Sequence, residues 1–220
     1  MKLDGLTINF LGDSITQGVG ASCADTIYHA VLKREANLKE TRNYGISGTR
    51  FARQHSVSEN PDDRFIDENY FCARFQNMEN ADAVVVFGGT NDYGHGDAPI
   101  GDFSDRTPDT FYGACHYLFK GLIKKYFGKP IVVITPLHRC DETKVGDNKT
   151  YERAILKTYV DVIREVAEYY SLPVLDLYKE SMMQPEIEEI KEKYMPDGLH
   201  PSDEGNAVIA YKLKKFLERL

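Results

Sequence analysis

The chain has 220 residues and a net charge of −7, and it contains no lysine- or arginine-dense block. An acidic chain without such a block is not expected to bind nucleic acid. Its length predicts one α/β domain over residues 1–220 and is too short for two ordinary enzyme domains.

Apolar, β-branched runs predict five strands, at residues 6–11, 41–44, 83–87, 131–135 and 173–177; the second and fifth are the weaker ones. Apolar residues at helical spacing predict helices over residues 28–36, 111–126, 155–166 and 209–220. Strands that alternate with helices indicate a mostly parallel sheet covered on both faces. Two long polar stretches, residues 50–67 and 93–109, are predicted as loops or short helices, and loops of that length are often functional.

The first predicted strand runs into Gly12-Asp13-Ser14-Ile15-Thr16-Gln17-Gly18. A serine on a glycine-flanked turn at a strand end is well placed to act as a nucleophile, because glycine lets the backbone turn sharply and a substrate approach. The stretch differs from a phosphate-binding P-loop in its glycine spacing, and Val19 stands where the lysine would be. It also lacks the second glycine of a Gly-x-Ser-x-Gly elbow. The alternative is a helix cap formed by Ser14 or Thr16.

Further polar groups follow the other predicted strands, in residues 45–49 and 88–92, and the segment 197–202 precedes the last helix. Ligands of such sheets gather at the carboxyl ends of the strands, so these loops should share one edge. Asp197 and His200 are three residues apart, so one turn can bring carboxylate and imidazole together. The alternatives are structural: Asp197-Gly198 is a common turn, and Ser202 can cap the last helix.

In combination these segments resemble the SGNH hydrolase superfamily, also called GDSL-type esterases and lipases. Its four sequence blocks are met by Gly12-Asp13-Ser14-Ile15, Gly45-Ile46-Ser47-Gly48, Gly89-Thr90-Asn91-Asp92 and Asp197-Gly198-Leu199-His200-Pro201. Ile15 stands where the family nickname has leucine. The resemblance covers nearly the whole chain and implies a single SGNH hydrolase domain with a flavodoxin-like three-layer α/β/α sandwich and a five-stranded parallel sheet.

The resemblance also implies the roles of the site residues. Ser14 is the expected nucleophile, His200 the general base and then acid, and Asp197 the group that orients His200. The oxyanion hole would comprise the backbone N–H groups of Ser14 and Gly48 and the side-chain amide of Asn91.

Taken alone, Gly48 and Asn91 also fit ordinary turn or loop-cap positions. Asp13 and Asp92 are expected to hold the loops through backbone hydrogen bonds.

No metal or organic cofactor is implied. Residues 138–141 contain a histidine, a cysteine and an aspartate, but we expect no metal there. The four cysteines are far apart and form no Cys-x-x-Cys pair, so they are expected to be free thiols. No secretory signal or membrane-spanning run is visible, which predicts a cytoplasmic protein without membrane insertion. The oligomeric state stays open.

The substrate is predicted from the two polar loops, which should form the rim of the site. Their charged and histidine side chains are His55, Asp62, Asp63, Arg64, His95, Asp97, Asp102, Asp105 and Arg106. A polar rim suits a hydrated substrate, so we expect a short-chain ester, an acetyl group on a sugar or glycoside. The alternatives are a lysophospholipase or thioesterase for longer acyl chains and, from another class, a non-catalytic flavodoxin-like binding domain.

Overall fold

A computed structural model describes residues 1–145 and 154–220. Its centre is a parallel sheet of β1 (Thr7–Gly12), β2 (Glu40–Gly45), β3 (Ala83–Phe87), β4 (Ile131–Ile134) and β5 (Val174–Leu175), in the order β2-β1-β3-β4-β5. Strands β1 and β2 pair in register from Thr7 with Glu40 to Gly12 with Gly45. This strand order is the flavodoxin-like one.

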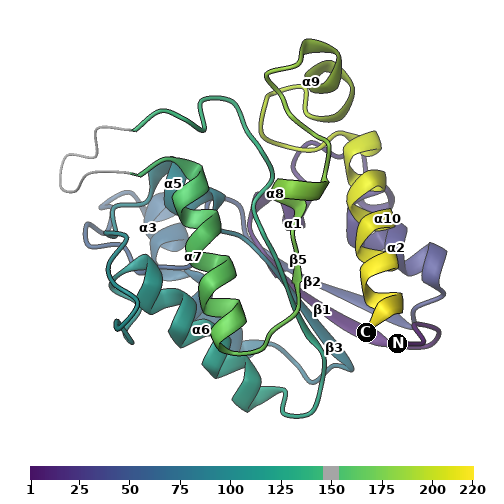
Figure 1. The fold of residues 1–220 in the computed structure, drawn as a ribbon, viewed down its shortest axis with the longest axis horizontal. Coiled ribbons are helices and arrows are strands. Elements are labelled where there is room, and N and C mark those ends of the chain that lie inside the picture. Colours follow the sequence, from purple (N-terminus) through teal and green to yellow (C-terminus); the bar gives the residue numbers. More distant parts are fainter. Residues whose placement is uncertain (146–153) are drawn as a thin grey trace.

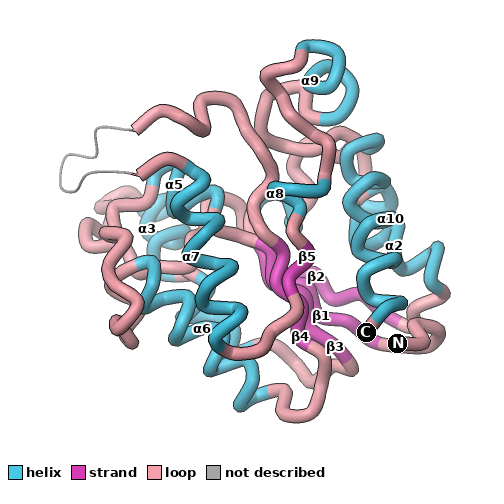
Figure 2. Tube along the Cα trace, in the orientation of Figure 1, coloured by secondary structure: helices cyan, strands magenta, loops and turns pink. Residues whose placement is uncertain are grey.

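Helices cover both faces of the sheet, with α6 and α7 on one side and α2 and α10 on the other (Figure 1). The helices are α1 (Ser14–Gln17), α2 (Tyr28–Ala36), α3 (Pro61–Glu68), α4 (Phe71–Arg74), α5 (Thr90–His95), α6 (Phe111–Lys125), α7 (Leu156–Tyr169), α8 (Leu177–Glu180), α9 (Glu188–Tyr194) and α10 (Asp203–Arg219), with short 3₁₀ turns at Ala24–Thr26 and Phe75–Asn77. The strands form the middle layer between them (Figure 2). The predicted three-layer α/β/α class is therefore confirmed.

Side chains alternate between the two faces of the sheet along each strand, and helices bury the apolar side chains on both faces. In β3, Val84 and Val86 belong to the core under α6 and α7, whereas Ala83, Val85 and Phe87 belong to the core under α2 and α10. Successive side chains of a strand point to opposite faces, so a continuous apolar run is buried on both. The two ends of the chain meet at one side of the molecule (Figure 1), where the Met1 amine donates to the carbonyl of Leu217 at 2.9 Å.

The main differences from the sequence-based elements lie near the ends of strands and in the loops. Strand β5 is shorter than predicted because Asp176 caps α8 by accepting a hydrogen bond from the Lys179 N–H. Helices α4, α8 and α9 were not predicted. The polar stretch 50–67 contains most of α3, which begins at Pro61 after the Asn60 cap, and 93–109 begins within α5. None of the described helices is long and apolar enough to cross a membrane.

Candidate active site

The predicted site segments all lie at the carboxyl edge of the sheet. The chain leaves β1 towards β2 on one side and returns to β3 on the other, which makes the β1–β3 boundary the switch point where such folds bind ligands. Ser14 follows β1, Gly48 follows β2 and Asn91 follows β3. The loop of Asp197 and His200 reaches the same edge from between α9 and α10.

Two hydrogen bonds join the three side chains that the sequence predicts to be catalytic. The Nε2 atom of His200 lies 3.0 Å from the Oγ atom of Ser14. On the other side of the ring, His200 Nδ1 lies 2.6 Å from Asp197 Oδ2. A carboxylate only accepts, so Nδ1 carries a proton and Nε2 of the neutral ring is free to accept from the serine hydroxyl.

Local backbone contacts hold the Asp197 carboxylate. Its Oδ1 accepts from the N–H groups of His200 at 2.7 Å and Leu199 at 2.9 Å. Partial burial opposes ionisation of Asp197, but the hydrogen bonds from the His200 backbone and ring and from Leu199 outweigh it and lower the pKa of this carboxyl. The Asp197 side chain is still 55% exposed, so short-range contacts, rather than deep burial, position it.

The segments around His200 fix its approach to Ser14. Gly20 has a φ of +91°, and a Cβ there would lie 3.0 Å from the Cβ of His200 and 2.6 Å from the Pro201 carbonyl. A side chain at this position would therefore push the histidine loop away. Ser202 caps α10 by accepting from Gly205, which is the structural role considered for it. Buried Asn206 donates to the Pro201 carbonyl at 3.0 Å and accepts from the Tyr28 N–H at 3.0 Å.

A buried carboxyl group, that of Asp13, supports the segment that carries Ser14. Asp13 precedes α1 and accepts from the Ile15 N–H at 3.0 Å, while Ser14 itself is 4% exposed. Burial raises the pKa of Asp13 to about 7, against the opposing effects of the Ile15 hydrogen bond and of Arg74. Asp13 thus has the loop-holding contact expected of it.

Arg74 of α4 ties the ends of the first two strands together. Its guanidinium donates to the carbonyl of Gly12 at 2.7 Å, to the carbonyl of Tyr44 at 2.5 Å and to the Thr49 hydroxyl at 2.9 Å. The side chain is buried, and burial lowers the pKa of Arg74 to about 10 although the nearby Asp13 favours the charged form. Arg74 therefore fixes the loops that carry Ser14 and Gly48 relative to each other.

The oxyanion candidates lie on neighbouring loops. Gly48 has a φ of +76°, and Asn91 donates from Nδ2 to the carbonyl of Thr49, the next residue, at 3.1 Å. The Gly48 loop is also tied to α1, because the Ser47 N–H donates to the Gln17 side chain at 2.5 Å.

Asp92 holds the next part of the β2 loop. Its carboxylate accepts from the N–H groups of Phe51 and Ala52 at 3.0 to 3.1 Å. Burial raises the pKa of Asp92 to about 6, and the two backbone donors oppose that rise.

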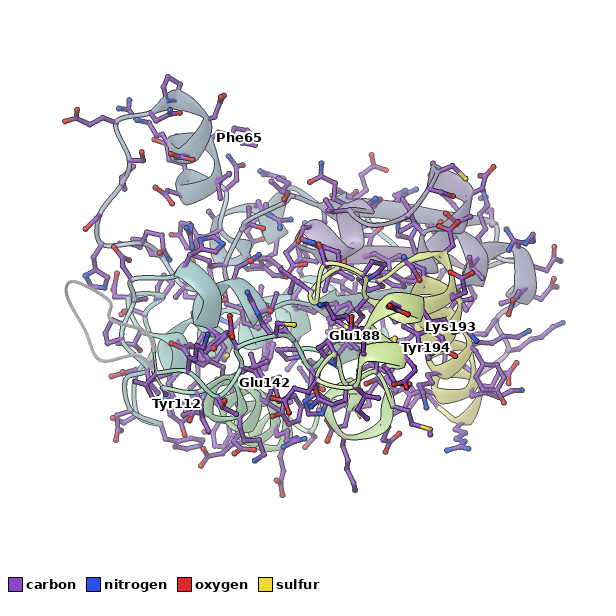
Figure 3. The ribbon with its side chains drawn as sticks, turned by 90° about the horizontal axis from the view of Figure 1, so that it is seen from above. Phe65, Tyr112, Glu142, Glu188, Lys193 and Tyr194 are labelled. Carbon is purple, nitrogen blue, oxygen red and sulfur yellow. The ribbon has the colours of Figure 1, made fainter. Side chains whose placement is uncertain are left out.

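The two polar loops form a hollow of about 340 Å³ beside the oxyanion candidates. Ile66 and His95, which line it, also surround Gly48: a Cβ on that glycine would lie 3.2 Å from Ile66 and 3.9 Å from His95. The lining is mainly polar and consists of Arg50, Gln54, Ser56, Ser58, Asp63, Ile66, Asp67, His95 and Asp97. Helix α3, which carries the exposed Phe65, stands out from the body here (Figure 3).

The end of the second loop does not follow the expectation that it forms the rim. Arg106 lies over the rings of Phe103 and Tyr169, and it lines a separate hollow on α6. In the same segment, the Phe103 ring packs edge-on against the rings of Tyr112 and His116 on α6 and of Tyr169 on α7, which holds the segment against these helices. The predicted rim is wrong for this segment.

Residues 138–141 enter other contacts. His138 Nδ1 lies 2.8 Å from the Glu142 carboxylate, and the Cys140 N–H donates to the Gly198 carbonyl at 2.9 Å. Within residues 1–145 and 154–220, no three histidine, cysteine or acidic side chains come together as metal ligands would. The four cysteines are free thiols.

Sequence reasoning missed Arg50, Arg74 and Asn206. Their partners lie 17 to 178 residues away along the chain. A buried arginine has the same sequence signature as a solvated one, so the sequence gives no signal for Arg74. Only their places close to the site motifs in the sequence could have drawn attention to Arg50 and Asn206.

Comparison with known proteins gives one matching family. The sequence model of the GDSL-like lipase/acylhydrolase family matches residues 10–208. No curated protein matches the chain.

Several solved structures share the fold. A protein from Lactobacillus plantarum is 31% identical, with 98% of both chains covered and a TM-score of 0.81. A possible lipase from Chitinophaga pinensis is 23% identical over 97% of this chain and 98% of its own, with a TM-score of 0.69. A two-domain esterase active on acetylated mannans is 21% identical over 98% of this chain and 49% of its own, with a TM-score of 0.63.

Proposed function

The chain belongs to the GDSL-like lipase/acylhydrolase family and is an ester hydrolase, and we propose that it hydrolyses short-chain esters of carbohydrates through an acyl-enzyme on Ser14. The observation that carries this proposal is the chain of contacts from Ser14 through His200 to Asp197, at 3.0 and 2.6 Å. A serine hydroxyl is a weak nucleophile until a neighbouring base takes its proton.

In the proposed mechanism, His200 Nε2 accepts the hydroxyl proton while Ser14 Oγ attacks the ester carbonyl carbon. Asp197 keeps the ring in the required tautomer and stabilises the imidazolium that forms. The tetrahedral oxyanion receives hydrogen bonds from the N–H groups of Ser14 and Gly48 and from the Asn91 amide. His200 then gives its proton to the departing alcohol, which leaves the acyl group on Ser14. In the second half, His200 takes a proton from a water molecule that attacks the acyl carbonyl, and it returns the proton to Ser14 as the acid leaves.

The polar hollow beside Gly48 supports the choice of acyl group. Eight of its nine lining residues are polar or charged, with Ile66 as the exception. Each buried CH₂ of an acyl chain would gain about 0.8 kcal/mol in an apolar pocket, and this lining offers little such surface. The fold neighbour that acts on acetylated mannans points to the same substrate class. We propose that residues 1–220 act as one domain with a small, hydrated ester as substrate.

A series of p-nitrophenyl esters tests both parts of the proposal. The kcat/KM value should be highest for acetate and fall from butyrate to octanoate, and acetylated oligosaccharides should release acetate. A rise up to octanoate would instead favour the lysophospholipase or thioesterase alternative. The Ser14→Ala variant should lose on the order of 10³-fold or more in kcat while it stays folded. Wild-type turnover by Ser14→Ala would refute an acyl-enzyme on Ser14. If the wild-type protein hydrolysed none of these esters, the alternative of a non-catalytic binding domain would be favoured.

A further inference from the structure

A relay of polar side chains runs from α3 to the amide proposed to bind the oxyanion. Asp67 Oδ1 accepts from Arg50 Nη1 at 2.8 Å, and Arg50 Nη2 lies 2.7 Å from Nδ1 of His95. On the far side of that ring, His95 Nε2 lies 3.2 Å from Oδ1 of Asn91. Asp67, Arg50 and Asn91 are at most 8% exposed, whereas His95 lies at the surface between them.

The chemistry of donors and acceptors fixes every member of this relay. Because an arginine only donates, Nδ1 of His95 must accept, and the ring proton then sits on Nε2. Nε2–H donates to Asn91, so the atom of Asn91 facing the ring is its carbonyl oxygen. The amide nitrogen of Asn91 is then the atom facing the Thr49 carbonyl, which can only accept. All four contacts are satisfied by one arrangement.

We infer that Arg50 and His95 are positioning residues that hold the Asn91 amide with its NH₂ group towards the reacting ester. This inference rests on the proposed function of Asn91 as an oxyanion donor. The Asn91 NH₂ group carries two hydrogens, and the Thr49 carbonyl takes one, which leaves the other for the oxyanion. A flipped amide would present its oxygen to the developing negative charge and would repel it.

The His95 ring connects two different parts of the site. Its ring bridges a buried ion pair and a substrate-facing amide, with Arg50 donating to one nitrogen and Asn91 accepting from the other. The Asp67 carboxylate also accepts from the Ser58 N–H at 3.0 Å, which anchors the far end of the relay. Hydrogen bonds behind a functional side chain, such as those of Arg50 and His95 behind Asn91, orient that side chain by locking its conformation.

The test is a set of His95 variants with and without Asn91. His95→Phe keeps a planar ring but removes the donor to Asn91, whereas His95→Gln retains an amide NH₂ near the position of Nε2. With p-nitrophenyl acetate, we expect His95→Phe to lower kcat about 10-fold with KM changed less than about 3-fold, since one oxyanion donor is misplaced. His95→Gln should recover most of this loss.

The decisive measurement is His95→Phe in an Asn91→Ala background. If His95 acts through Asn91, the second substitution causes no further loss of kcat, because no amide remains to be oriented. Equal losses in the two backgrounds would overturn the inference while leaving Ser14 and Asn91 in their proposed roles. If the Asn91→Ala variant alone keeps the full wild-type kcat, Asn91 does not stabilise the oxyanion and this inference fails with that role. The serine mechanism would still be decided separately, by the Ser14→Ala variant.

Discussion

The two halves of the site are held in different ways. The predicted acid–base half, Asp197 and His200, lies on one loop. Contacts within three residues hold the carboxylate, which is 55% exposed, and Gly20 and Asn206 help to place the loop. The proposed oxyanion half, Gly48 and Asn91 with their supports, is held by buried side chains from distant segments, among them Arg74 at 8% exposure. The difference teaches that contacts within one loop orient the groups proposed for proton transfer, whereas the proposed oxyanion donors depend on packing across the sheet edge.

The largest expected effect breaks the acid–base half alone. In Asp197→Asn, the carboxamide donates to His200 Nδ1 and holds the ring proton on Nε2, so the ring can no longer accept from Ser14. We expect kcat to fall on the order of 10³- to 10⁴-fold. The free energy of unfolding should change by less than about 0.5 kcal/mol, because the side chain is largely exposed. Steady-state kinetics and urea unfolding on the same preparation measure both.

A matched comparison comes from Asp82→Asn. Asp82 directly precedes β3, at the edge of the sheet opposite the candidate site, so kcat should stay at the wild-type value. If Asp197→Asn kept its activity, Asp197 would not orient the base. If its activity fell only in proportion to a loss of folded protein, the substitution would act through stability and not through the local contact with His200.

The second prediction breaks the oxyanion half. Arg74→Met removes the buried guanidinium that donates to the carbonyls of Gly12 and Tyr44 and to the Thr49 hydroxyl. We expect the free energy of unfolding to fall by about 3 kcal/mol, the range for buried groups that lose a charged partner. Arg53→Met is the control, because the Arg53 side chain is 53% exposed and its substitution should cost less than about 1 kcal/mol. Similar urea midpoints for Arg74→Met and Arg53→Met would show that the buried contacts of Arg74 do not stabilise the proposed oxyanion half.

The third prediction concerns the pH dependence of stability, where the expected change within one pH unit is the smallest of the three. Burial raises the pKa of Asp13 to about 7 from an ordinary value of 3.8, so the folded chain keeps a proton that the unfolded chain releases. The stability from this group is therefore complete below about pH 4 and is lost as the pH rises towards 7.

Asp13→Asn cannot ionise but can still accept from Ile15. The stability of the wild type relative to this variant should fall between pH 4 and 7, by on the order of 1 kcal/mol per pH unit. Urea unfolding at several pH values measures it, and a constant gap between the two proteins would show that Asp13 titrates as it does in the unfolded chain.

The sequence predicted the parts of the molecule that depend on local pattern. β3 and α2 have the predicted bounds, because continuous apolar runs and helical spacing are local signals. Asp197 and His200 make the contact that their spacing predicts. The contacts of Arg74 and Arg50 could not be predicted, since they depend on which backbone carbonyls and carboxylates the fold brings beside them. The turn of the chain around Arg106 also depended on tertiary contacts, with the rings of α6 and α7.

The most direct test of the central claim is to map the site of covalent labelling by a fluorophosphonate. We expect a single adduct on the peptide that contains Ser14, no adduct there in Ser14→Ala, and much slower labelling in His200→Ala, which lacks the base 3.0 Å from the hydroxyl. Labelling of a different residue, or undiminished ester hydrolysis by an enzyme whose Ser14 is fully labelled, would contradict the account.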